Sequence, residues 1–249
     1  MYKGHIDYVT EIDGVAFDPF EIGHKHSLVE KVRIEAIDGK LKIRFFVLNV
    51  TSCDEAYQLT QSMVDGILDK LSFILGVPIH SARYSGGSIE REVVAENGSK
   101  SVEVQGTGVI GLMVSALLIR KLSPELVENL RRNMEREDIP GTEYLNQFRF
   151  ALQSPDPVTR FMFLYSILLA IFDDSQKEVD DFIREVEPTV SVTPRPDRPD
   201  IYETIYTRLR NEVGHHRPNV NPANTKKEMA RLLPKLIDLV RKAIKQASL

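Results

Sequence analysis

The stretch 29-VEKVRIEAIDGKLKIRFFVLNV-50 decides the fold of the first part of the chain. Two runs rich in β-branched and other apolar residues, Val29–Ile37 and Leu41–Val50, flank the dipeptide Asp38-Gly39. An Asp-Gly pair supports the positive φ angles that a tight two-residue turn requires. The stretch therefore predicts an antiparallel β-hairpin.

A second hairpin is predicted around Asn97-Gly98, another dipeptide that favours a tight turn. Its strands are Ile89–Ala95 and Ser101–Gln105. In the second strand Val102 and Val104 alternate with polar residues, a pattern typical of a sheet with one solvated face.

Between the two hairpins, the sequence predicts one long helix from about Ser52 to Leu75. Ser52 and Glu55 form a capping-box pattern at its start, and Gly76 and Pro78 end it. Apolar residues recur at three- and four-residue spacing and predict one buried stripe: Ala56, Leu59, Met63, Ile67, Leu71 and Ile74. Residues 1–120 are thus expected to form an α+β domain in which this helix covers a mostly antiparallel sheet.

Residues 121–249 are expected to form a second, helical domain. Ser123-Pro124-Glu125 has the N-cap, proline and early acid of a helix start. Helical spacing continues over Glu143–Gln153, Pro157–Phe172, Gln176–Glu185, Ile201–His215 and Asn224–Ala247. Four prolines between 188 and 199 predict an extended loop inside this domain.

Composition restricts the class of protein. With 42% hydrophobic and 27% charged residues, the 249-residue chain can build ordinary globular cores. The single cysteine, Cys53, cannot form an internal disulfide, which favours a cytoplasmic location. No signal peptide is recognised, and the apolar run 109–119 is too short to cross a bilayer, so no membrane association is expected.

The net charge of −4 argues against a protein that coats nucleic acid, but the charge is unevenly distributed. Residues 173–187 are acidic, whereas ten Lys and Arg face three acids over residues 206–249. Such a basic surface can attract phosphate, and Arg208, Arg217, Arg241 and Lys242 are its predicted RNA-binding residues. The alternative is an ordinary solvated helix surface.

The most informative motif is 210-RNEVGH-215, near the end of a predicted helix. Asn211 and His215 are four residues apart and share one helix face, so the amide can orient the imidazole. Histidine titrates near neutral pH and guanidinium is always charged, so His215 can move protons while Arg210 holds phosphoryl charge. The structural alternative is that Gly214 ends the helix, His215 lies at its negative end and Arg210 is merely exposed.

The motif resembles the Arg–polar–x–x–x–His signature of the HEPN superfamily, whose members are small helical bundles. The apolar helix 160-RFMFLYSILLAIF-172 also resembles the core helix of such bundles. The resemblance covers roughly residues 123–249. It implies a homodimer in which paired motifs cut RNA without metal or cofactor. The ribose 2′-hydroxyl would attack the phosphate, with His215 moving protons, Arg210 as transition-state clamp and Asn211 as orienter.

By the same resemblance, the protein would act in stress or phage defence, as toxin members of the superfamily do, with a regulatory protein or antitoxin as a possible partner. Some toxin members carry a tyrosine two residues after the histidine, a site that the antitoxin modifies. This chain has Arg217 there, so that mode of control is not expected. The alternative is a non-catalytic dimerising or ligand-binding module in which Arg210 and His215 are structural.

Three other patterns in the sequence are weaker signals. Residues 106–111 match the G-x-G-x-x-G pattern, but the following segment does not continue as a dinucleotide-binding unit, so a glycine-rich strand end is predicted. His24 and His26 lack further ligands at metal-binding spacing and are predicted to be loop residues, with no metal site. Cys53 lies where a helix dipole lowers a thiol pKa, although a small, partly buried residue is preferred.

Overall fold

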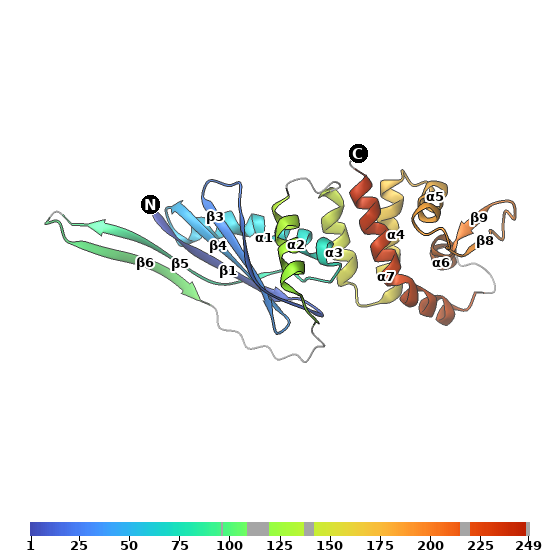
Figure 1. Ribbon diagram of the computed structural model, residues 1–249, viewed down its shortest axis with the longest axis horizontal. Coiled ribbons are helices and arrows are strands. Elements are labelled where there is room, and N and C mark those ends of the chain that lie inside the picture. The colour runs from blue at the N-terminus through green and yellow to red at the C-terminus, as the bar shows by residue number, and fades with distance from the viewer. Residues whose placement is uncertain (96, 109–119, 137–141, 215–219, 248–249) are drawn as a thin grey trace. The chain divides into compact units, whose positions relative to one another are not determined.

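The computed structural model describes residues 1–95, 97–108, 120–136, 142–214 and 220–247. It divides into two compact units, residues 1–137 and 138–249, and each is described by itself (Figure 1).

Unit 1 is built on a mostly antiparallel sheet, as predicted. Its described strands, listed in chain order, are β1 (Tyr2–Glu11), β2 (Val15–Gly23), β3 (Val29–Ile37), β4 (Lys40–Val50), β5 (Arg83–Val94), β6 (Lys100–Gly108) and β7 (Arg120–Lys121). They are ordered β6-β5-β1-β4-β3-β2-β7, and only the β2/β7 pair among them is parallel. The α+β class of this part of the chain is therefore confirmed.

Both predicted hairpins are present. Asp38 and Gly39 have φ angles of 52° and 72°, the positive values that a tight turn between β3 and β4 demands. Gly98, with a φ of 78°, turns the chain between β5 and β6. The strands of this second hairpin extend further than predicted, because β5 begins at Arg83 and β6 ends at Gly108.

The sheet has a central strand, β1, that sequence reasoning did not predict. It lies between β4 and β5 and pairs with both. It buries Ile6 and Tyr8, while Asp7 on the opposite face receives two hydrogen bonds of 2.7 Å from Arg44. Polar residues on this partly solvated face interrupt the apolar pattern and hide the strand in the sequence.

β6 does not bury its valines as the alternation indicated. Val102 and Val104 are 59% and 60% exposed. The opposite face of the strand carries Glu103, whose carboxylate accepts a 2.7 Å hydrogen bond from Arg91 of β5. Since β6 is an edge strand, its pairing with β5 rather than apolar burial holds it in place.

Helix α1 (Cys53–Leu75) follows β4, and its predicted ends are confirmed. The Ser52 side chain accepts a hydrogen bond from the Glu55 backbone, and Gly76 ends the helix with a φ of 69°. The buried stripe differs from the prediction, because Thr60, Val64 and Leu68 lie at its centre. Three of the six predicted residues, Leu59, Met63 and Ile74, are only partly buried beside the core.

Helix α2 (Pro124–Glu135) belongs to unit 1, whereas the sequence placed it in the helical domain that starts at 121. It buries Val127, Leu130 and Met134 in the same core as the sheet and α1. The physical reason is its apolar stripe, which packs against β2 and α1.

Unit 2 consists of helices and one small hairpin. Its described elements are η1 (Thr142–Tyr144), α3 (Leu145–Gln153), α4 (Pro157–Ile171), α5 (Gln176–Val186), β8 (Val192–Pro194), β9 (Tyr202–Thr204), α6 (Ile205–Gly214) and α7 (Pro222–Gln246). The proline-rich segment predicted as a loop contributes β8, which pairs with β9. Residues 202–204 are therefore strand rather than the start of a helix.

Helix α4 is the centre of unit 2, as its apolar sequence predicted. It contacts α3, α5, α6 and α7, and Phe161, Leu164, Tyr165 and Leu168 are fully buried. None of the described helices combines the length and the apolar character that a membrane crossing requires.

Candidate functional site

The predicted motif lies at the end of α6. Arg210 is half-buried, Asn211 is 1% exposed, and Gly214 is the last residue of the helix. His215 and Arg217 lie outside the described residues, so the structure places only the first part of the motif.

The Asn211 side chain forms hydrogen bonds with three other side chains, those of Glu203, Gln176 and Arg210. Its Nδ2 donates to Oε2 of Glu203 at 2.9 Å, and its Oδ1 accepts from Nε2 of Gln176 at 3.1 Å. Glu203 is itself 1% exposed and precedes α6, while Gln176 opens α5. Because the amide is buried and bonded on both ends, it has one fixed orientation.

Arg210 is positioned by this amide. Its Nη1 donates to Oδ1 of Asn211 at 3.0 Å. The guanidinium of Arg210 is thus already restrained before any anion binds. It loses less conformational freedom on binding an anion than an arginine side chain on an open helix surface would lose. In the described residues Asn211 therefore orients Arg210, whereas its predicted partner His215 lies outside them.

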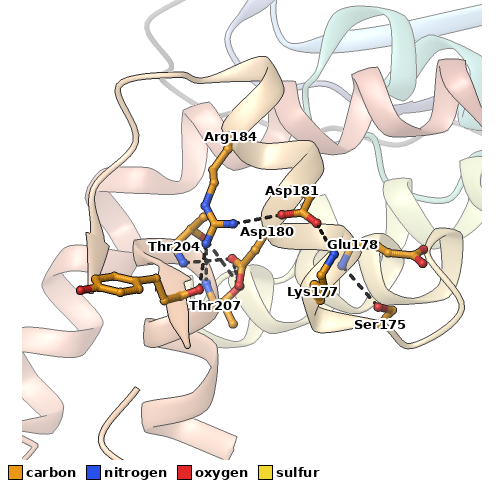
Figure 2. A network of polar contacts seen from close by, with 9 residues as sticks. Ser175, Lys177, Glu178, Asp180, Asp181, Arg184, Thr204 and Thr207 are labelled. Atoms are coloured by element: carbon orange, nitrogen blue, oxygen red, sulfur yellow. Dashed lines mark hydrogen bonds and ion pairs between the residues drawn. The ribbon is translucent and has the colours of Figure 1, made fainter. Parts of the chain in front are cut away.

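A second buried carboxylate, Asp180 of α5, supports the start of α6 (Figure 2). Asp180 is 5% exposed and accepts hydrogen bonds from the Thr204 amide at 3.0 Å and from the Thr207 hydroxyl at 2.7 Å. The Thr207 hydroxyl has one proton, which it donates to Asp180. In the 2.7 Å hydrogen bond between the Tyr165 and Thr207 hydroxyls, Tyr165 must therefore be the donor. Burial raises the pKa of Tyr165, which keeps this donor protonated.

On the outer side of α5, Figure 2 shows a chain of ion pairs that ends on the small hairpin. Lys177 and Arg184 contact the Asp181 carboxylate at 2.8 and 3.0 Å. Arg184 also donates to the Tyr202 carbonyl of β9 at 2.8 Å. The acidic charge predicted for this segment is thus partly neutralised within it.

Arg208, a predicted RNA-binding residue, is part of an ion-pair network between α6 and α7. It donates to the carboxylates of Glu212 and Glu228. Glu212 also accepts a 2.7 Å hydrogen bond from the Thr225 hydroxyl. With two carboxylates beside it, the guanidinium of Arg208 has less positive charge to offer a phosphate than its sequence position indicated.

Arg241 and Lys242, the other described RNA-binding candidates, lie at the far end of α7. Burial lowers the pKa of Arg241, whose Nη1 is 3.6 Å from Asp238, while Lys242 is exposed. They follow Glu228, the partner of Arg208, by thirteen and fourteen residues, which corresponds to about 20 Å of helix. The predicted RNA-binding residues are thus not one cluster.

A basic face along α7 connects the two ends of this helix. At 100° per residue its members lie within one third of the helix circumference, and all are exposed: Lys227, Arg231, Lys235, Lys242 and Lys245. Lys235 pairs with Glu187 at 2.6 Å, and Asp238 lies on the same face. Only Lys242 of this face was among the predicted residues, although the four-residue spacing of Lys227, Arg231 and Lys235 is visible in the sequence.

The buried acids Glu203 and Asp180 were also missed. Nothing in the local sequence marks them, because their partners come from other elements. One signal was available: Thr204 and Thr207 form an N-terminal capping pattern, in which the Thr207 amide donates to the Thr204 hydroxyl at 3.4 Å. It would have placed the start of α6 at 205.

The weaker candidates have ordinary structural surroundings. The Cys53 thiol donates to the Gln105 carbonyl at 3.4 Å, and burial raises its pKa rather than lowering it. His24 and His26 accept hydrogen bonds from backbone amides two residues later. Within the ranges that the structure describes, no group of three or more His, Cys, Asp or Glu residues could hold a metal ion. Gly106 and Gly108 lie in β6, and residues 109–111 lie outside the described residues.

Comparison with known proteins adds no relative. No family model, no curated protein and no solved structure matches this chain.

Proposed function

We propose that unit 2 is a metal-independent endoribonuclease of the HEPN type that acts as a homodimer. The observation that supports this proposal is the position of Arg210. The guanidinium of Arg210 donates a hydrogen bond to Asn211, which is buried and anchored by Glu203 and Gln176. Arg210 precedes His215 by five residues in the sequence. Phosphodiester cleavage without metal requires a fixed cation and a proton-transfer group, and in this proposal Arg210 and His215 supply them.

In the proposed reaction, His215 accepts the proton of a ribose 2′-hydroxyl, and the 2′-oxygen forms a bond to the adjacent phosphorus. The bond from phosphorus to the 5′-oxygen breaks, and that oxygen leaves with a proton. The products are a 2′,3′-cyclic phosphate and a 5′-hydroxyl end. Arg210 stabilises the charge that develops on the phosphoryl oxygens.

The basic face of α7 is the proposed RNA-docking surface. Lys235 of this face is paired with Glu187, and the other four cations would contact phosphates without reading the bases. Changing Arg231 and Lys242 to Glu is expected to weaken RNA binding and to flatten its dependence on salt concentration. The same changes should leave the fold intact because both side chains are exposed.

The test of catalysis compares RNA cleavage in EDTA by the wild type and by His215→Ala and Arg210→Lys variants. Loss of the proton-transfer group is expected to slow cleavage about 10²- to 10⁴-fold, and loss of the fork-shaped cation about 10²-fold or more. Asn146→Ala, an exposed change on α3, is the control and should keep full activity. Absence of cleavage by the wild type, or equal cleavage by all variants, would refute the proposal.

A second candidate is a non-catalytic module in which the motif is structural. It is favoured by the bonding of both Arg210 and Asn211 inside unit 2. Under that proposal Arg210→Lys lowers the free energy of unfolding, and no RNA is cut. Under the first proposal Arg210→Lys lowers the cleavage rate much more than the stability. A role in growth arrest, a cytoplasmic location and a regulatory partner remain parts of the first proposal.

A further inference from the structure

The hairpin of β5 and β6 extends beyond its neighbour β1 in unit 1 (Figure 1). The last residue of β5 that pairs with β1 is Glu90, which lies opposite Lys3. Among the described strands, residues 91–94 of β5 and 100–103 of β6 therefore pair only with each other, and we call these two stretches the arm. A two-stranded ribbon without a third strand is at most marginally stable in water, so a partner along the arm would stabilise it.

Exposed valines lie on one face of this hairpin. Val94, Val102 and Val104 are all exposed, Val94 by 61%. They share a face because Val94 lies opposite Lys100 and every second residue of a strand points to the same side. The other face is polar at the corresponding position, where Glu103 forms an ion pair with Arg91. The described parts of unit 1 thus leave an apolar row uncovered on this face.

The outer edge of β6 also offers backbone groups to a further strand. β6 is the last strand of the sheet, and no described strand pairs with its outer side. At the turn, the Ala95 amide donates to the Ser99 carbonyl. Every second residue of an antiparallel ladder bonds to the neighbouring strand, so Ser101 and Glu103 direct their amide and carbonyl groups to β5. The residues between them direct these groups outward: Lys100, Val102 and Val104.

This edge lacks the usual obstacles to strand addition. Proteins commonly interrupt an exposed edge with a bulge or a proline. The pairing of β6 with β5 runs without a register shift from Lys100 to Gly108, and the strand contains no proline. A regular edge beside exposed valines is a surface to which another strand can add through its main chain.

We propose that β6 pairs edge to edge with β6 of a second copy of this chain, antiparallel about a two-fold axis at Val102. A two-fold axis brings the same surface of both copies together, so the strand must be complementary to itself. With this axis the two Val102 residues lie opposite each other, and Lys100 lies opposite Val104 of the second copy. Each of these three outward pairs exchanges two hydrogen bonds, so about six form between the two main chains. The valines of both copies then form one apolar cluster.

The side chains of β6 favour this register over its neighbours. With the axis at Val102, Glu103 lies opposite Ser101 of the second copy. An axis at Glu103 would bring two carboxylates directly opposite each other, which destabilises a sheet. An axis at Ser101 would place Val104 opposite Gly98 and leave this valine without an apolar partner. The contact lies in unit 1 and does not depend on the ribonuclease proposal or on the dimer proposed for unit 2.

The first test is disulfide cross-linking of the full chain in a Cys53→Ser background, which removes the one native cysteine. Val102→Cys should form a covalent dimer in a glutathione redox buffer. Opposite residues of a hydrogen-bonded pair have Cα atoms about 5.5 Å apart, within the range of a disulfide. Val104→Cys is the matched control and should not cross-link, because its counterpart lies four residues along the second strand, about 13 Å away.

Three outcomes of this experiment would overturn the proposal. They are no covalent dimer of Val102→Cys, equal dimer formation by both variants, and stronger cross-linking of Val104→Cys. Adding His215→Ala removes the proposed catalysis and should leave the Val102→Cys dimer unchanged, so the two proposals can fail separately.

The second test removes hydrogen bonds from the outer edge alone. Val102→Pro deletes an amide that points outward, so the bonds between β6 and β5 are kept. In sedimentation velocity, the wild type should self-associate, and the variant should raise the dissociation constant about tenfold or more through the loss of two bonds. Val93→Thr on β5 is the control and should leave this constant unchanged. A wild type that does not self-associate, or an unchanged constant in Val102→Pro, would overturn the proposal.

Discussion

Replacing Asn211 by alanine tests whether the buried amide organises the motif. The change removes three hydrogen bonds: one to the carboxylate of Glu203, one from Gln176 and one from Arg210. A hydrogen bond to a charged group contributes about 1.5–3 kcal/mol and a neutral one about 0.5–1.5 kcal/mol. Because Glu203 is 1% exposed, water cannot easily replace the lost donor. At the lower ends of these ranges the three bonds together contribute about 3.5 kcal/mol, so we expect unit 2 to lose at least that much unfolding free energy.

The assay is urea denaturation followed by circular dichroism at 222 nm, since the chain contains no tryptophan. Gln176→Ala removes a single neutral bond and should cost about 1 kcal/mol. Asn146→Ala on α3 is exposed and should change stability by less than about 0.5 kcal/mol. If Asn211→Ala were as stable as Asn146→Ala, the amide would not anchor α6, and the argument that it positions Arg210 would fail.

Two further predictions concern other parts of the fold. Gly4→Ala would place a Cβ 2.0 Å from the Ser88 carbonyl oxygen, so β1 and β5 must separate. We expect the change to lower the unfolding free energy by at least about 2 kcal/mol, measured by thermal melting. Gly23→Ala is the control and should melt like the wild type, because its Cβ would meet nothing within 4 Å. Asp156 caps α4 and pairs with Lys226, and the Lys226 hydrogen bond lowers its pKa to about 2. The contribution of the ionised Asp156 carboxylate to the stability of unit 2 should therefore be complete above about pH 4 and lost as the pH falls through 2. An Asp156 pKa that stays the same in Lys226→Gln, measured by carbon NMR, would contradict this assignment.

The local parts of the fold could be predicted because short-range chemistry determines them. Asp38 and Gly39 have the positive φ angles that an Asp-Gly pair favours. Ser52 caps the start of α1 with its side chain, and Gly76 ends the helix with its backbone. β1 could not be predicted in this way. Its solvated face carries His5 and Asp7, whose partner Arg44 is distant in sequence.

For the candidate site, sequence reasoning selected the motif but not what surrounds it. Spacing predicted that Asn211 and His215 share one helix face. Asn211 lies on α6, and His215 lies outside the described residues. Glu203, Gln176 and Asp180 come from other elements and are brought together only by packing. The charge count likewise did not reveal that Arg208 is already paired with Glu212 and Glu228, because ion pairing depends on how α6 meets α7.

The position of α2 has a consequence for the order in which the chain matures during synthesis. Met134 is the most C-terminal residue of the first core, although the sheet that it covers is nearly complete by residue 108. When only the sheet has been synthesised, the apolar surface of β2 and α1 that α2 will cover is therefore still exposed to solvent. Unit 1 can finish folding only after α2 has emerged, and until then the edge strand β6 and this open face are the surfaces that a chaperone would have to shield.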